Sequence, residues 1–273
     1  PMLTSTYKVY AIRYATIDRR TIDNFLVHGI ADPHETMPMD FYFWLITDGV
    51  HHIAVDTGFS ADASQRRNRP YRETPEQSLS RLGIAPDSIS DVILTHLHYD
   101  HAGNCDLFHS ATLHVQEREM SFATGRHMCH RAINHFFEMD DVVTVLRRVF
   151  NGRVRFHDGD SQVASGIELY LAGGHTPGLQ MVRVNTERGW IVLASDALHY
   201  YRNYDEANPF PAIFHVGDML DAYDRLSFLA DSADHIVPGH DPEVARRYPE
   251  FAANSNIFCL HKPPYTALHA TGY

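Results

Sequence analysis

The stretch T-H-L-H-Y-D-H-A-G-N, residues 95–104, places four metal-binding side chains within six positions, directly after the apolar run 92–94. These side chains are His96, His98, Asp100 and His101. A catalytic zinc ion takes about four ligands and keeps one position for water, so four protein donors are too many for one such ion. The pattern predicts two metal ions, with His96 and His98 on the first and Asp100 and His101 on the second.

Three further donors follow other strand-like runs of the chain. They are His175, Asp196 and His240, each in a loop flanked by Gly or Ser. Open α/β sheets gather their functional groups at the carboxyl ends of the strands, so we expect these side chains to meet the first four. His175 then completes the first site, His240 completes the second, and the carboxylate of Asp196 bridges the two ions.

Composition limits what else the chain can be. At 273 residues and 44% hydrophobic, it is long enough to bury a large core. A net charge of -11 argues against a broad nucleic-acid surface, and no run of apolar residues approaches the length of a membrane span. No secretory signal is visible, and three scattered cysteines favour a reducing compartment, so we expect a cytoplasmic protein.

The order of predicted elements indicates one α/β domain over residues 1–273, with no linker that would separate two domains. Between its halves, the segment of about 116–150 is predicted to be a helical insertion and is a candidate lid. Strands are predicted at 7–12, 41–47, 51–55, 91–95, 166–171, 190–194 and 236–237, and helices at 74–82 and 218–231.

Together these loops resemble the metallo-β-lactamase superfamily. The resemblance is carried by five motifs in the family's order: Val55-Asp56-Thr57-Gly58, the stretch 95–103, Gly174-His175-Thr176-Pro177-Gly178, Ser195-Asp196 and Pro238-Gly239-His240. It implies a four-layer αββα sandwich with two metal ions at one edge of the sheets. It also implies that Asp56 hydrogen-bonds a ligating histidine and fixes its tautomer.

Within the superfamily, the motif loop, the length and the long segment before Asp40 resemble the N-acyl-homoserine lactone lactonases. Antibiotic-hydrolysing members usually have Cys or Ser where this chain has Asp196. One departure concerns the lactonases themselves, which usually have Tyr three residues after the bridging Asp. Here that position is His199, which we expect to donate a hydrogen bond to the developing oxyanion.

The residues allow a mechanism in which a hydroxide that bridges two Zn²⁺ ions attacks the lactone carbonyl; other divalent ions are compatible with the donor set. Asp100 is the candidate for moving the proton to the leaving alkoxide, and His199 is the second catalytic candidate. Tyr99, Phe59, Met39 and Phe137 are the predicted substrate contacts. We expect a small-molecule lactone as the partner, no nucleic acid or membrane, and a homodimer as one oligomeric state open to the chain.

Two alternatives within hydrolase chemistry stay open. The substrate could be another small or aromatic lactone of the pyridoxolactone type, or the enzyme could be a thioesterase similar to glyoxalase II. A glutathione thioesterase needs basic residues near the C-terminus, and Lys262 is the only Lys or Arg after Arg247. A short basic run, Arg66, Arg67, Arg69 and Arg72, is interpreted as a solvated loop or as a contact for a substrate anion.

Overall fold

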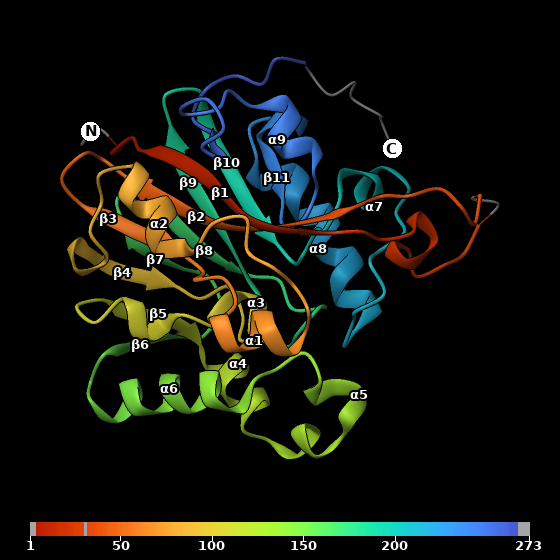
Figure 1. The fold of residues 1–273 in the computed structure, drawn as a ribbon, viewed down its shortest axis with the longest axis horizontal. Coiled ribbons are helices and arrows are strands. Elements are labelled where there is room, and N and C mark those ends of the chain that lie inside the picture. The colour runs from red at the N-terminus through yellow and green to blue at the C-terminus, as the bar shows by residue number, and fades with distance from the viewer. Residues whose placement is uncertain (1–3, 30–31, 267–273) are drawn as a thin grey trace.

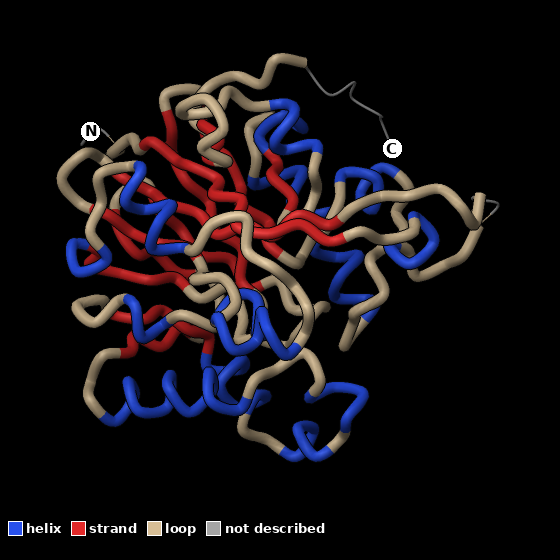
Figure 2. Tube along the Cα trace, in the orientation of Figure 1, coloured by secondary structure: helices blue, strands red, loops and turns tan. Residues whose placement is uncertain are grey.

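The computed structural model describes residues 4–29 and 32–266 and has two β-sheets packed face to face (Figures 1 and 2). The seven-stranded sheet has the order β12-β1-β2-β3-β4-β5-β6, and the five-stranded sheet has the order β11-β10-β9-β8-β7. The strands are β1 Lys8–Ile17, β2 Met39–Thr47, β3 His52–Val55, β4 Ile89–Ile93, β5 Thr112–Gln116, β6 Val154–His157, β7 Ser161–Ala164, β8 Ile167–Leu171, β9 Gln180–Thr186, β10 Gly189–Ser195, β11 Ile236–Pro238 and β12 Ile257–Cys259.

Helices cover the outer faces of both sheets (Figure 1). The α-helices are α1 Ala61–Arg66, α2 Pro75–Arg81, α3 Tyr99–Ala102, α4 Glu117–Ala123, α5 Arg131–Asn134, α6 Met139–Phe150, α7 Tyr201–Asp205, α8 Val216–Leu229 and α9 Glu243–Arg247. Short 3-10 turns occur at η1 Thr21–Asn24, η2 Pro86–Ser88, η3 Cys105–Leu107, η4 Arg126–Cys129 and η5 Ala233–His235. Among the described residues, no helix combines the length and the apolar character needed to cross a bilayer.

Three apolar clusters hold these layers together. Residues of both sheets, including Trp44 and Ile191, form the central one, which fits the alternation of buried positions along the strands. A second cluster fills the space between the seven-stranded sheet and its helices, and a third lies between the five-stranded sheet and α8. The result is the four-layer αββα sandwich that the resemblance to the metallo-β-lactamase superfamily implies.

Local sequence signals explain several element boundaries. Helix α2 begins with a capping box in which the amide of Gln77 donates to Thr74 Oγ1 at 3.2 Å and Gln77 Oε1 accepts from the amide of Thr74 at 3.0 Å. Strands β2 and β3 form an antiparallel hairpin around Asp48 and Gly49. Strands β3 to β6 run parallel, so the loops that follow β3 and β4 leave the sheet at the same edge.

The predicted helical segment of 116–150 contains α4, η4, α5 and α6. Helix α6 packs in the outer layer, where the buried guanidinium of Arg148 donates to the carbonyl oxygens of Ala111, Cys105 and Phe108 at 2.8 to 3.0 Å. Other residues of the segment, Ala132, Ile133, His135 and Phe136, line the cavities described below. A lid role for the whole segment stays a prediction.

Candidate metal centre

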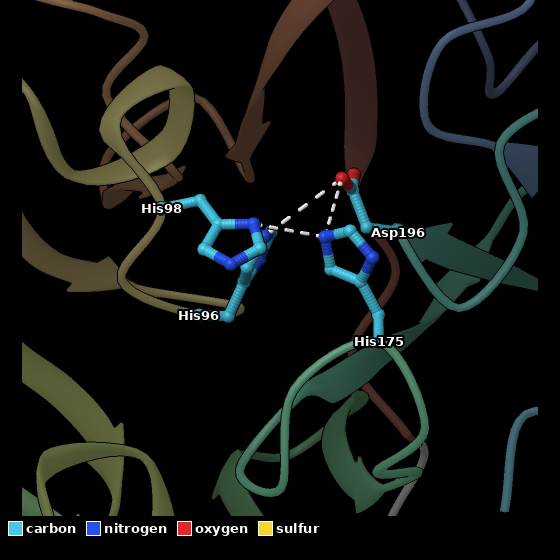
Figure 3. A group of neighbouring side chains, drawn as sticks. All are labelled: His96, His98, His175 and Asp196. Carbon is cyan, nitrogen blue, oxygen red and sulfur yellow. Dashed lines mark hydrogen bonds and ion pairs between the residues drawn. The ribbon is translucent and has the colours of Figure 1, made fainter. Parts of the chain in front are cut away.

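The loops after four strands, β4, β8, β10 and β11, bring the seven predicted donors into two groups that share one residue. One group is His96, His98, His175 and Asp196, and the other is Asp100, His101, Asp196 and His240. Within each group, one donor atom from every residue lies within 4.8 Å of the others. Figure 3 shows the first group, with the three imidazoles and the carboxylate directed toward a common point.

The carboxylate of Asp196 faces both groups. Its Oδ2 lies 3.1 Å from His175 Nε2 and 3.8 Å from His96 Nε2. Its Oδ1 lies 3.2 Å from His101 Nε2 and 3.1 Å from His240 Nε2. One oxygen toward each group is the arrangement that a bridging carboxylate requires.

Hydrogen bonds on the far side of the rings fix how the histidines present their nitrogens. The Nδ1 of His175 donates to the carbonyl of Ala212 at 2.6 Å, and the Nδ1 of His240 donates to the carbonyl of Asp40 at 2.7 Å. A carbonyl oxygen can only accept, so Nε2 of each neutral ring presents a lone pair to the cluster.

Asp56 fixes His101 in the same way. Its Oδ2 lies 2.6 Å from His101 Nδ1, and its Oδ1 accepts from the amide of Thr95 at 2.7 Å. The hydroxyl of Thr95 lies 2.8 Å from Asp56 Oδ2 and 2.9 Å from Ser195 Oγ. Asp56 and Ser195 both have positive φ, at 61° and 48°, a conformation that the surrounding contacts must hold in place.

The buried polar atoms of the cluster meet the requirements of a metal site. Among the described residues, His96 Nε2, His101 Nε2 and Asp196 Oδ1 are buried and have no hydrogen-bond partner. Such atoms are costly unless something satisfies them, and a cation between them would do so. Five imidazoles and two carboxylates form a nitrogen and oxygen donor set of the kind that zinc accepts.

The charge states of the side chains follow from burial and from their neighbours. Burial lowers the pKa values of His96 and His98 well below the ordinary value, and the nearby histidines add to this effect. Burial also acts to lower the pKa of His101, but the carboxylates of Asp196, Asp100 and Asp56 raise it overall. Neutral imidazoles are the form that binds metals.

His199 has a different position from the one expected for a free oxyanion donor. Its Nε2 lies 3.2 Å from Asp196 Oδ2, and its ring stacks on Phe210 with centroids 4.1 Å apart. Burial lowers its pKa to about 3. The side chain lines the cavity beside the cluster, but its Nε2 is directed at the shared carboxylate.

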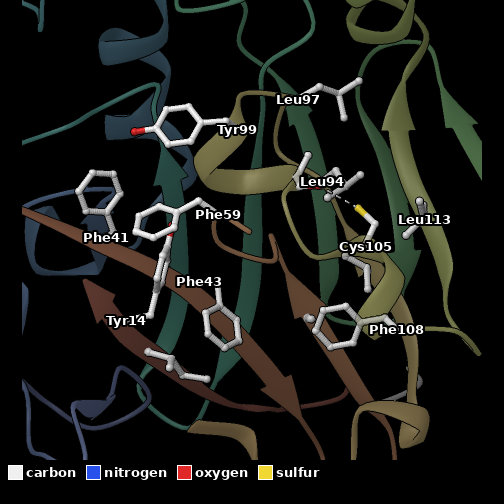
Figure 4. Packing of buried hydrophobic residues seen from close by; sticks show 14 of the residues in the cluster. Tyr14, Phe41, Phe43, Phe59, Leu94, Leu97, Tyr99, Cys105, Phe108 and Leu113 are labelled. Atoms are coloured by element: carbon white, nitrogen blue, oxygen red, sulfur yellow. Dashed lines mark hydrogen bonds between the residues drawn. The ribbon is translucent and has the colours of Figure 1, made fainter. Parts of the chain in front are cut away.

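A cavity of about 270 Å³ opens onto both groups. Of the predicted substrate contacts, Tyr99 and Met39 line it, whereas Phe137 contacts the ring of His98 and lines a separate groove. Phe59 corrects the prediction: it is 0% exposed and packs between Tyr14 and Tyr99 in the core (Figure 4). An aromatic residue just after a strand can face either the cavity or the core. Phe59 packs in the apolar core cluster.

Part of the cavity wall consists of residues that the sequence motifs do not indicate. Arg19, Phe41 and Phe210 line it, together with His135 of the helical segment. Arg67 and Arg69 also line it, and the basic run was the one signal in the sequence that indicated a cationic wall. Cys105 is buried away from this wall, and burial raises the pKa of its thiol to about 12.

The sequence pattern of the Metallo-beta-lactamase superfamily matches residues 42–240, and the chain belongs to that superfamily. The family and the donor set together define a metal-dependent hydrolase. The chain is 27% identical to the N-acyl homoserine lactonase AiiA of Bacillus thuringiensis subsp. kurstaki, over 85% of this chain and 95% of the relative.

Two further similarities agree with this one. The N-acyl homoserine lactonase AiiB of Agrobacterium fabrum is 29% identical, over 76% of this chain and 80% of the relative. The crystal structure of a quorum-quenching N-acyl homoserine lactone lactonase superposes with a TM-score of 0.72 at 25% identity and covers 88% of this chain and 95% of that one.

Proposed function

We propose that the protein is a dinuclear zinc hydrolase that opens the ring of a lactone, with an N-acyl-homoserine lactone as the favoured substrate. The observation that carries the proposal is the pair of four-residue groups that share Asp196. His96, His98 and His175 would hold the first ion, Asp100, His101 and His240 the second, and Asp196 would bridge them. Other divalent ions are compatible with these donors.

Two bound divalent ions would supply water with a pKa near neutrality and positive charge beside the ester carbonyl. Asp100 would accept a proton from the attacking water and return it to the alkoxide that leaves the opened ring. Its position supports this role, because its Oδ2 lies 3.3 Å from His101 Nε2 and 3.6 Å from His240 Nε2 and its side chain reaches the cavity.

His199 would act mainly through Asp196. An imidazole Nε2–H that donates to Oδ2 of Asp196 fixes the rotation of the shared carboxylate, and this carboxylate sets the spacing of the two groups. We therefore propose this positioning role in place of the oxyanion contact predicted from the sequence.

An apolar cavity next to the candidate centre supports an acyl chain as part of the substrate. This cavity has a volume of about 360 Å³ and shares His98, Phe136, His175 and Ala212 with the first one. Its other walls come from Phe122, His127, Ala132, Ile133, Ile213 and Phe214. Such a surface gains free energy by removing an alkyl chain from water, about 0.8 kcal/mol for each buried CH₂.

A substrate panel with the zinc-loaded protein tests the function. It contains short and long N-acyl-homoserine lactones, γ- and δ-lactones, an aromatic lactone and S-lactoylglutathione. We expect turnover of the acyl-homoserine lactones and loss of that turnover in Asp196→Asn. The control Asp87→Asn changes an exposed carboxylate in η2 that belongs to neither donor group, and it should keep normal turnover. Turnover of the thioester with none of any lactone would refute the proposal.

A further inference from the structure

Three arginines from two distant parts of the sequence line the cavity that opens onto the candidate metal centre. Arg19 follows β1, and Arg67 and Arg69 follow α1. The neighbouring acyl cavity is lined mostly by apolar side chains. The two cavities therefore have walls of different chemistry, although they share His98 and His175.

The guanidinium of Arg19 is held in place on two sides. Its Nε donates to Asn24 Oδ1 at 2.6 Å, one terminal nitrogen donates to the carbonyl of Asp23 at 2.7 Å, and its Cζ lies 5.0 Å from the ring centroid of Phe210. Phe210 in turn stacks on His199. Arg19, Phe210 and His199 thus form a continuous stack, and His199 contacts Asp196.

Arg69 and Arg67 lie around the ring of Tyr99. Arg69 donates to the hydroxyl of Tyr99, and its Cζ lies 5.5 Å from the centroid of Phe41. The Cζ of Arg67 lies 3.8 Å over the Tyr99 ring, and its Nε contacts Glu138 at 2.9 Å. The aromatic contacts orient both guanidinium groups without neutralising them.

Ion pairs balance the positive charges on this wall only in part. Arg67 is paired with Glu138, but within the described ranges neither Arg19 nor Arg69 has an ion pair with a carboxylate. Burial lowers the pKa of Arg19. Tyr200 and the carboxylate of Asp23 act to raise it, and the positive charge of Arg69 acts to lower it. Two half-buried cations that line one cavity are best satisfied by an anion, because guanidinium groups match the geometry of a carboxylate.

We propose that Arg19 and Arg69 form a carboxylate subsite, so that the enzyme prefers lactones whose substituent ends in a carboxylate over neutral lactones of the same length. This inference rests on the proposed lactone hydrolysis and narrows its substrate class. Arg67 serves the subsite by holding Tyr99, to which Arg69 donates. The subsite gives a cationic cavity to a chain whose net charge is -11.

The test compares acids with their methyl esters on the zinc-loaded protein. N-succinyl- and N-glutaryl-homoserine lactone, with their methyl esters, give pairs that differ mainly in charge, and carboxyphthalide with its methyl ester gives an aromatic pair. We expect kcat/KM for the acid to exceed that for the ester by about 10- to 100-fold in at least one pair, the effect of one charge-assisted contact. A ratio of one or less in every pair overturns the proposal.

Variants of the arginines test whether they cause the preference for acid over ester substrates. In Arg19→Gln/Arg69→Gln the acid-to-ester ratio should fall toward one, and in Arg69→Lys, which keeps the charge, it should be partly retained. Arg72→Gln is the matched control, because Arg72 belongs to the same basic run but is exposed and contacts Thr16 outside the cavity. Each ratio compares two substrates on one preparation, so loss of folded protein cancels. An unchanged ratio in the double variant overturns the subsite.

A binding measurement separates this proposal from the proposed function. The corresponding γ-lactams have an amide in place of the ester and resist hydrolysis, so titration calorimetry measures their binding without turnover. Tighter binding of the acid lactams that is lost in the double variant supports the subsite even if no lactone is hydrolysed, in which case only the proposed function fails. Equal binding of acid and ester lactams overturns the subsite, whatever the lactonase activity.

Discussion

The Nε2 atom of His199 lies 3.2 Å from Oδ2 of Asp196, the carboxylate shared by both donor groups. The His199 ring is nearly parallel to the rings of Phe210 and His240, with centroid distances of 4.1 Å and 5.3 Å. A residue that stacks on one donor and contacts another is placed to set their relative geometry.

Loss of His199 should therefore reduce turnover more than metal content. We expect His199→Ala to lower kcat by about 10- to 100-fold, the usual effect of removing a partner of a metal ligand, while two ions stay bound. His199→Gln keeps a donor and should recover part of the loss. Metal analysis beside steady-state kinetics makes the measurement, and a His199→Ala enzyme with unchanged kcat would contradict the positioning role.

His240 belongs to one donor group only, so its removal should act on one ion. We expect His240→Ala to bind about one zinc per chain instead of two and to lose most turnover, because only the first group stays complete. Elemental analysis of the purified variant gives the stoichiometry. Two bound ions and full activity in that variant would rule out the assignment of His240.

Asp56 should influence metal affinity without being a ligand. Its Oδ2 contacts His101 Nδ1 at 2.6 Å, and an amide in Asp56→Asn loses the charge that favours this contact. We expect zinc affinity at the second group to fall by about 10- to 100-fold, measured by competition with a chelator. An affinity equal to that of the Asp87→Asn control would show that the contact does not matter for binding.

The donors could be predicted from the sequence because each follows a strand-like run in a short loop, and parallel strands carry such loops to one edge. His96 and His101 lie in one motif, so local spacing was enough. Arg19 and Phe210 could not be predicted in this way, because a long irregular segment and the loop before α8 reach the cavity through tertiary packing. Phe59 was predicted as a substrate contact because it directly follows the motif 55–58. Whether its side chain faces the cavity or the core depends on tertiary packing, and it packs in the core.

Glu119 hydrogen-bonds to two of the donor loops, the one that carries His96 and His98 and the one that carries His175. Its buried carboxylate accepts from the amide of Leu97 at 2.9 Å, from the hydroxyl of Thr176 at 2.7 Å and from the amide of Gly178 at 3.0 Å. A Cβ on Gly178 would lie 2.2 Å from the amide nitrogen of Glu119, so only glycine permits this approach.

Glu119→Ala leaves three buried donors without a partner and should lower the free energy of unfolding by about 3 kcal/mol or more. Glu119→Gln keeps an acceptor oxygen and should cost less than the alanine variant. Urea unfolding of the zinc-loaded proteins measures both values. Stability of Glu119→Ala within about 1 kcal/mol of the parent would mean that water replaces the carboxylate.

Asp141, in α6, belongs to neither donor group, and its ionisation should make the stability of the protein depend on pH. The residue is 8% exposed, and its Oδ2 has no hydrogen-bond partner among the residues that the structure describes. Burial raises its pKa to about 7, with further raising by Glu138 and Asp140 that Arg66 and Arg67 only partly offset. The folded protein therefore disfavours the ionised carboxylate.

The sign of the effect follows from the two pKa values. The unfolded chain ionises this group near pH 4, so between about pH 4 and 7 the folded state holds the proton more tightly and stability falls as the pH rises. Asp141→Asn cannot ionise, and it should be more stable than the parent at pH 8 by up to about 3 kcal/mol relative to their difference at pH 5. Denaturant unfolding at both pH values, with Asp87→Asn as the control, measures this difference. If the gap between Asp141→Asn and the parent is the same at pH 5 and pH 8, Asp141 is ionised in the folded protein without cost, and the unpartnered oxygen must be satisfied by solvent.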